Sequence, residues 1–183
     1  MLIVDDIHGK KEEELSLRYQ AERDLLTGAY NRAAAENKIN TMLSKRGEDS
    51  LAALFLIDLD NFKLINDRMG HAKGDQVLQE TVHTLQVCFG DIAIIGRLGG
   101  DEFLVFIPES ASIEMIHTHA KRLVQSLKST YTNEDVQITV SASIGIVIAP
   151  KSDISFNELY LQADKALYYV KYHDKNGYKI YGE

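Results

Sequence analysis

Cysteine, positive charge and long apolar runs are all in short supply in this sequence. The lone Cys88 excludes a disulfide framework and a cysteine metal site, and it is typical of a reducing compartment. The longest apolar run, Leu51 to Ile57, is far shorter than the roughly 20 residues that cross a bilayer. Acids follow Met1-Leu2-Ile3-Val4 at once, so we expect no signal peptide. Together these features predict a cytoplasmic chain without membrane contact.

Acidic residues outnumber basic ones by 27 to 20, which gives a formal net charge of -7. This balance argues against broad nucleic-acid binding, because that binding depends on a cationic surface. An anionic ligand would need a local cationic pocket or bound metal ions.

The pattern of apolar residues predicts an α+β fold with a largely antiparallel central sheet of about five strands, flanked by helices and of the split βαβ kind. We expect strands over 51–57, 92–95, 103–107, 138–144 and 178–181. We expect helices over 10–24, 31–45 and 62–69. A longer helix should follow a turn at 70–75, another should span about residues 113–127 after the hairpin, and a last helix should span 156–172. Apolar and polar residues alternate over 137–144, which predicts one polar face for that strand.

Residues 97–103 read Arg-Leu-Gly-Gly-Asp-Glu-Phe between two apolar runs. Two glycines in that setting predict a tight hairpin turn. A hairpin does not require the acids Asp101 and Glu102. Taken alone, they are more typical of a solvated turn than of a site.

A second pair of acids follows the buried strand, in the order Asp58-Leu59-Asp60. If this strand lies beside the hairpin, Asp58 and Asp101 converge, and two carboxylates with a backbone carbonyl suit Mg²⁺ and phosphoryl chemistry. The next helix would offer free N–H groups to phosphate, with Lys63 beside them. The alternative is that both acids only cap this helix, which we favour for Asp60 but not for Asp58.

Six ordered motifs together resemble the GGDEF family, the bacterial diguanylate cyclases. They cover residues 24–32, 58–67, 70–75, 97–103, 143–145 and 163–168. The resemblance extends from about residue 24 to the C-terminus, which leaves residues 1–23 as a linker helix. Residues 3–11 are similar to the exit from a PAS sensor domain, so we expect the chain to be the output module of a longer receptor.

The resemblance implies a palm-like, nucleotide-cyclase-like fold that joins two GTP molecules into cyclic di-GMP across a homodimer, with release of pyrophosphate. It implies two Mg²⁺ ions per active site, or Mn²⁺, held by Asp58, the Leu59 carbonyl and Asp101. Asp101 is also the base proposed for the attacking 3′-hydroxyl, and Glu102 would assist the metal or the hydroxyl. Lys63 would stabilise charge on the phosphates.

Further residues fall where the family binds GTP, and several have a simpler interpretation. Asp75 can accept both guanine N1–H and N2–H₂, which adenine lacks, although it could instead cap the following helix. His71 could bind nucleotide or only support its turn. The remaining candidates are Asn66, Phe62, Gly99, Gly100, Lys171 and Lys175. Of these, Phe62 is more typical of a core anchor, and the glycines would let GTP lie close to the backbone.

Two stretches depart from the family pattern. Gly90 and Ala93 stand where many members carry the Arg and Asp of an inhibitory product site, so we expect no product inhibition there. Residues 171–176 read Lys-Tyr-His-Asp-Lys-Asn in place of Lys-x-x-Gly-Arg-Asn. Lys175 lacks the bidentate fork of arginine, which predicts a lower affinity for GTP.

Two other functions are compatible with this fold. A non-catalytic GGDEF-like module would bind GTP or dock a partner, but such modules generally lose an acid of the turn or a metal ligand. A cyclase that makes a 3′,5′-cyclic mononucleotide is disfavoured by the turn sequence and by Asp75.

Overall fold

The computed structural model describes residues 17, 19–47, 51–110, 112–134, 136–149 and 154–183. Its strands are β1 (Tyr30–Asn31), β2 (Leu51–Asp60), β3 (Ile94–Gly99), β4 (Glu102–Ser110), β5 (Ser129–Thr132), β6 (Gln137–Ala149) and β7 (Gly177–Ile180). Its helices are α2 (Arg32–Leu43), α3 (Phe62–Met69), α4 (His71–Phe89), the short η1 (Gly90–Ile92), α5 (Ile113–Ser126) and α6 (Phe156–His173).

The described strands form one sheet in the order β1-β3-β4-β2-β6-β5, with β7 also paired to β6. The β2, β3, β4, β5 and β6 pairings are antiparallel, whereas β1 and β7 run parallel to their neighbours. The α+β class is confirmed, and the sheet has seven strands where we expected about five. The two unexpected strands, β1 and β5, are short and lie towards its edges.

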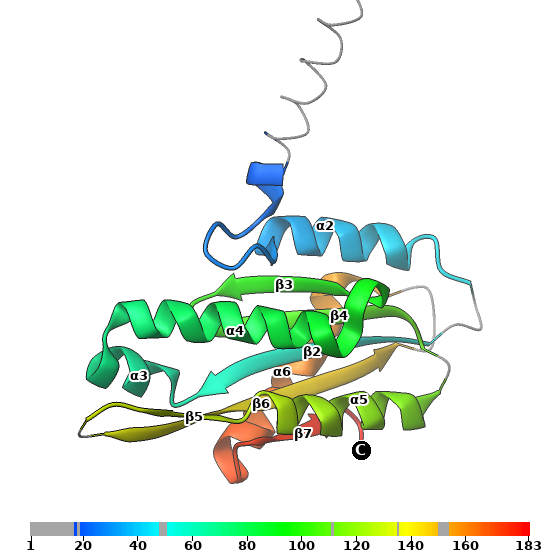
Figure 1. Ribbon diagram of the computed structural model, residues 1–183. Coiled ribbons are helices and arrows are strands. Elements are labelled where there is room, and N and C mark those ends of the chain that lie inside the picture. Colours follow the sequence, from blue (N-terminus) through cyan, green and yellow to red (C-terminus); the bar gives the residue numbers. More distant parts are fainter. Residues whose placement is uncertain (1–16, 18, 48–50, 111, 135, 150–153) are drawn as a thin grey trace, which may run out of the picture.

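Helices cover both faces of the sheet (Figure 1). Alternate residues of β2 face opposite sides because successive side chains of a strand point in opposite directions. Phe55 and Ile57 pack with α4 and α5, while Leu54 and Leu56 pack with α2 and α6. Both faces of β2 are therefore buried, as its continuous apolar sequence predicts.

Two local expectations were wrong. The turn expected at 70–75 is reduced to Gly70, whose φ of 87° ends α3, and α4 begins at His71. The apolar residues of 113–127 recur at helical spacing, which predicts one buried face, but Ile113 at the start of α5 is 44% exposed. Along the polar face of β6, Gln137 is exposed and Thr139 is half-buried, whereas Ser141 and Ser143 are buried.

The helix expected over 10–24 lies largely outside the described residues. Of its described residues, Leu17 and residues 19–22 are helical. The similarity of residues 3–11 to a PAS exit lies entirely outside the described residues. None of the described helices is long and apolar enough to cross a membrane.

Candidate active site

The acids after β2 lie beside the Gly-Gly turn. Asp58 is directly opposite Glu102 in the β2–β4 ladder. The backbone N–H of Leu59 donates to the carbonyl of Asp101 at 3.3 Å. The expected convergence of the strand end and the hairpin is therefore confirmed at the level of the backbone. We call this end of the sheet, formed by Asp58, Leu59, Asp101 and Glu102, the acidic edge.

Asp58 is the buried member of the acidic edge, with 8% of its surface exposed. Its Oδ2 lies 2.6 Å from the Nζ of Lys171, which projects from the last turns of α6. Burial raises the pKa of Asp58, the contact with Lys171 lowers it, and the neighbouring charges of Asp101 and Glu102 raise it further. The net direction of the pKa of Asp58 is upward, and burial is the largest cause.

Asp60 has a different environment from Asp58, although only one residue separates them. Its carboxylate accepts hydrogen bonds from the hydroxyls of Ser141 and Ser143, both at 2.8 Å, and from the backbone N–H of Asn176 at 3.0 Å. The expectation that Asp60 caps α3 was wrong, because all three donors come from β6 and the end of the chain. Asp60 therefore links β2 to β6 and to the segment after α6 through hydrogen bonds.

The N-cap position of α3 belongs to Asn61, in the left-handed region with φ of 65° and without a side-chain capping bond. Its side-chain amide instead donates to the carbonyl of Thr139 at 3.0 Å. The first turn of α3 therefore has no side-chain cap, as an anion-binding helix start requires. Lys63, exposed, lies in that turn.

Arg97 holds the Gly-Gly turn. Its Nε and Nη2 donate to the carbonyl of Gly100 at 3.1 and 2.8 Å, and its Nη1 lies 3.0 Å from Oδ1 of Asp24. Gly100 has a φ of 52°, which an L side chain rarely adopts. Asp101 follows in the turn, and Glu102 is the first residue of β4.

The candidate nucleotide-binding residues of α3 and α4 lie on a helical hairpin that begins directly after the acidic edge. A Cβ added to Gly74 would lie 2.0 Å from Oδ1 of Asn66, so this glycine makes room for the asparagine side chain. His71 and Asp75 are exposed on the first turns of α4. The alternative role of Asp75 as a cap is excluded because Gly70 is the N-cap. Phe62 is 8% exposed and belongs to the core.

The two lysines expected at phosphate differ in their settings. Lys171 is partly buried against Asp58, whereas Lys175 is exposed in the turn after α6, with a left-handed φ of 49°. The backbone N–H of Lys175 donates to the carbonyl of Val170 at 2.9 Å. The turn thus brings Asn176 to Asp60.

The donors at the acidic edge fit Mg²⁺, which the sequence resemblance implies. The expected ligands are two carboxylates and a carbonyl, all of them oxygens, and the like charges around Asp58 favour an added cation. Among the described residues, no group of three or more His, Cys, Asp or Glu side chains forms a metal-binding cluster. The expected magnesium ligands include only two such side chains, Asp58 and Asp101, together with the Leu59 carbonyl.

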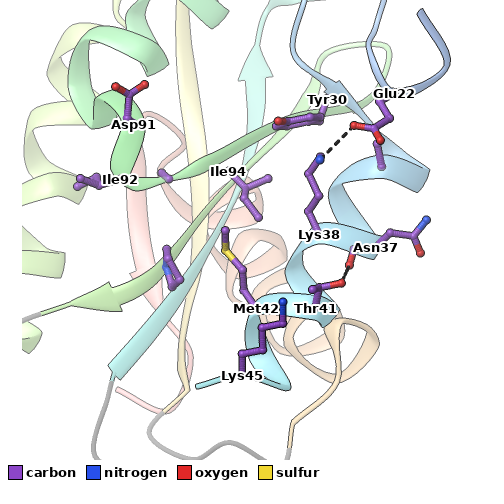
Figure 2. A pocket seen from close by; sticks show the side chains of 13 residues that line it. Glu22, Tyr30, Asn37, Lys38, Thr41, Met42, Lys45, Asp91, Ile92 and Ile94 are labelled. Atoms are coloured by element: carbon purple, nitrogen blue, oxygen red, sulfur yellow. Dashed lines mark hydrogen bonds and ion pairs between the residues drawn. The ribbon is translucent and has the colours of Figure 1, made fainter. Parts of the chain in front are cut away.

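A pocket of about 810 Å³ lies apart from these residues, between α2 and β3 (Figure 2). Lys38 and Glu22 form an ion pair of 3.1 Å in its wall, and Met42 of α2 and Lys45 in the turn after α2 also line it. It contains none of the candidate residues of the acidic edge or of α3 and α4.

Comparison with known proteins identifies the family. The family described as "Diguanylate cyclase, GGDEF domain" matches residues 21–177. The chain belongs to the GGDEF family. As a GGDEF domain it is 35% identical over 164 residues to diguanylate cyclase TpbB from Pseudomonas aeruginosa, covering 88% of this chain and 38% of TpbB. It is 30% identical over 166 residues to cyclic di-GMP phosphodiesterase PdeR from Escherichia coli, covering 91% of this chain and 25% of PdeR.

The solved GGDEF domain of TpbB has a similar fold, with a TM-score of 0.77 at 30% identity, covering 87% of this chain and 94% of that one. The chain therefore spans well under half the length of these curated relatives but nearly all of an isolated GGDEF domain. The similarity concerns the GGDEF domain and not the other parts of those proteins.

Proposed function

We propose that this GGDEF domain is a diguanylate cyclase, which condenses two GTP molecules into cyclic di-GMP and two pyrophosphates. The observation that carries the proposal is the acidic edge itself. Asp58 lies opposite Glu102 and next to the Asp101 backbone, and a lysine lies within reach. This arrangement supports phosphoryl transfer, which requires oxygen donors for metal and cations for phosphate in one place.

Asp58, the Leu59 carbonyl and Asp101 would hold Mg²⁺, two ions per active site, or Mn²⁺. Bound there, the metal would polarise the α-phosphorus and lower the pKa of the attacking 3′-hydroxyl. Glu102, opposite Asp58, would add a further acid to this edge. Arg97 supports the turn that carries Asp101, because its guanidinium donates two hydrogen bonds to the carbonyl of Gly100.

In each of two steps the 3′-oxygen of one GTP forms a bond to the α-phosphorus of the other, and the bond to pyrophosphate breaks. The first step gives a linear dinucleotide and the second closes the ring. The hydroxyl proton passes to the Asp101 carboxylate. Lys63, Lys171 and Lys175 would stabilise the charge on the phosphates and on the departing pyrophosphate.

Guanine would be selected by the α3–α4 hairpin. The Asp75 carboxylate accepts from N1–H and N2–H₂ of guanine, and adenine would leave it unpaired. Asn66 and His71 would contact the base or the sugar. The exposure of His71 and Asp75 leaves both side chains open to a ligand.

One chain supplies one half of the reaction centre, because each GTP must meet the GTP of a second domain. We therefore propose a homodimer as the active state, in the cytoplasm, where GTP is available. An upstream sensor domain would control this assembly in the full-length protein.

The test is an assay with GTP and Mg²⁺ across a range of protein concentrations, with mass spectrometry of the products. We expect cyclic di-GMP and a rate per subunit that rises with concentration, since the dimer is the active species. Asp101→Asn serves as the inactive reference with an unchanged fold. Absence of cyclic di-GMP and of the linear intermediate at high concentration would contradict the proposal. A cyclic mononucleotide would identify a different cyclase.

A second candidate is a non-catalytic module that binds GTP and regulates a partner. Two observations favour it: the relative PdeR is named a phosphodiesterase, and Asp174-Lys175 replace the usual Gly-Arg. Calorimetry separates the two functions, because the module would bind GTP without forming product.

A further inference from the structure

The ammonium of Lys171 lies where a cation at the acidic edge is most needed. Its Nζ is 2.6 Å from Oδ2 of Asp58, and the side chains are 34% and 12% exposed respectively. Such a short contact between charged groups is a charge-assisted hydrogen bond. The charges of the Asp101 and Glu102 carboxylates also act on Lys171.

Asp58 would be costly to leave alone in this position, because a mostly buried carboxylate without a cation loses its hydration without compensation. Among the described residues, Lys171 is the ion-pair partner found for Asp58. The same Oδ2 cannot at full strength hold both an ammonium and a divalent ion, since both compete for its lone pairs. In the metal-free domain, Lys171 therefore occupies the Asp58 oxygen that a metal ion would need.

The backbone around Lys171 is anchored while its side chain is long. The segment after α6 is fixed by two bonds, from Lys175 N–H to Val170 and from Asn176 N–H to Asp60. Lysine carries a compact charge on a flexible stem of four carbons, which can redirect the ammonium over several ångströms without backbone movement.

We propose that Lys171 is the resident counterion of Asp58 in the metal-free domain, and that it is displaced by the incoming divalent cation and transferred to the phosphates of the nucleotide. This inference rests on the proposed function for its second half, because only a nucleotide-binding domain offers phosphates to the released lysine. The counterion role rests on the ion pair between Lys171 and Asp58 and does not depend on the proposed function. Metal and nucleotide binding are thereby coupled through one side chain.

The decisive measurement is Mn²⁺ affinity without nucleotide, by electron paramagnetic resonance, for the wild-type domain and Lys171→Met. We expect the variant to bind Mn²⁺ roughly two- to fivefold more tightly, because a partly exposed ion pair that opposes metal binding has been removed. Lys165→Met is the matched control, because Lys165 is exposed on the same helix and lies 6.0 Å from the centre of the Tyr181 ring, away from Asp58. Its Mn²⁺ affinity should equal that of the wild type.

The second measurement is the affinity for a non-hydrolysable GTP analogue with Mg²⁺ present. Lys171→Met should bind it more weakly, so that the two affinities change in opposite directions. A purely structural role would weaken both. Lys171→Gln, which keeps a long side chain without charge, replaces the methionine variant if that variant fails to fold.

The outcomes separate this inference from the proposed function. Equal or weaker Mn²⁺ affinity in both charge-removing variants would overturn the counterion role, even in an active cyclase. Tighter Mn²⁺ binding in a domain that makes no cyclic di-GMP would support the counterion role and contradict the proposed reaction.

Discussion

Arg97 joins Asp24, which follows the N-terminal helix, to Gly100 of the Gly-Gly turn through one guanidinium. Its contacts to the Asp24 carboxylate and the Gly100 carbonyl are 3.0 and 2.8 Å. Asp24 itself closes a turn, because it also accepts from the N–H and the hydroxyl of Thr27 at 2.9 and 2.6 Å. The segment that follows the N-terminal helix is thereby tied to the turn that carries Asp101.

Replacing Arg97 by Met should therefore loosen the turn. We expect a loss of about 1–3 kcal/mol in the free energy of unfolding, because a hydrogen-bonded, partly buried ion pair is broken. Turnover of GTP should fall because Asp101 is less well positioned. Urea denaturation and the activity assay measure the two effects. Arg122→Met, which removes an exposed arginine of α5, is the control, and an equal loss in both variants would argue against a specific role for Arg97.

The environment of Asp24 predicts an acid-sensitive contribution to stability. Burial raises its pKa, but hydrogen bonds from Thr27 and Arg97 outweigh burial and lower it overall. Because the pKa of Asp24 is lower in the folded than in the unfolded state, its ionised carboxylate stabilises the fold at pH values above the unfolded pKa of about 4. This stabilisation is lost as the pH falls through the folded-state pKa. Asp24→Asn should therefore be less stable than the wild type at pH 7, with the difference shrinking towards pH 3. A difference independent of pH would contradict this assignment.

Gly74→Ala should weaken GTP binding although alanine is the better helix former. In an ordinary helix this change stabilises by about 1 kcal/mol. Here the added Cβ would lie 2.0 Å from Oδ1 of Asn66, so the asparagine must move. The control is Gly47→Ala, whose Cβ would have open space. Calorimetry with a GTP analogue should show lower affinity for Gly74→Ala alone, and unchanged affinity would remove Asn66 from the nucleotide site.

Asp58 and Asp60 should respond differently to the same substitution. Asp60→Asn loses charge-assisted bonds from two hydroxyls and one N–H, and should lower the free energy of unfolding by about 1–3 kcal/mol. Asp58→Asn should abolish turnover with a smaller change in stability. Denaturation and activity are measured for both, with the exposed Asp67→Asn as control. A stable Asp60→Asn variant would contradict the structural role.

Local sequence was sufficient for much of the fold. The continuous apolar run of β2 predicts a buried strand, and the structure buries it. In the helix expected after residues 70–75, Leu78, Val82 and Leu85 recur at helical spacing, which predicts one apolar face, and all three are buried in α4. Asn31, the first residue of the helix expected over 31–45, is a residue type that favours N-caps, and it caps α2 by accepting from Ala34 N–H at 3.0 Å. The convergence of Asp58 with the Gly-Gly turn could also be predicted, because a buried strand and a hairpin in one sheet place their acids at one end.

The errors arise where the deciding partner is distant in sequence. An acid before a helix normally caps it, but Asp60 finds Ser141 and Ser143, more than 80 residues away. These hydrogen bonds explain why the polar face of β6 is buried at Ser141 and Ser143. Strands β1 and β5 are short and carry polar residues, so their pairing depends on tertiary context rather than on an apolar pattern.

The bond from Asn176 N–H to Asp60 ties the segment after α6 to the end of β2, two residues from Asp58. A fragment ended after α6 would keep every acid of the motif and both faces of β2. It would also lack β7, which pairs with β6 beside Ser143. The boundary of a usable domain is therefore set beyond the last helix, and a fusion partner attached at residue 174 would disturb the site it was meant to report on.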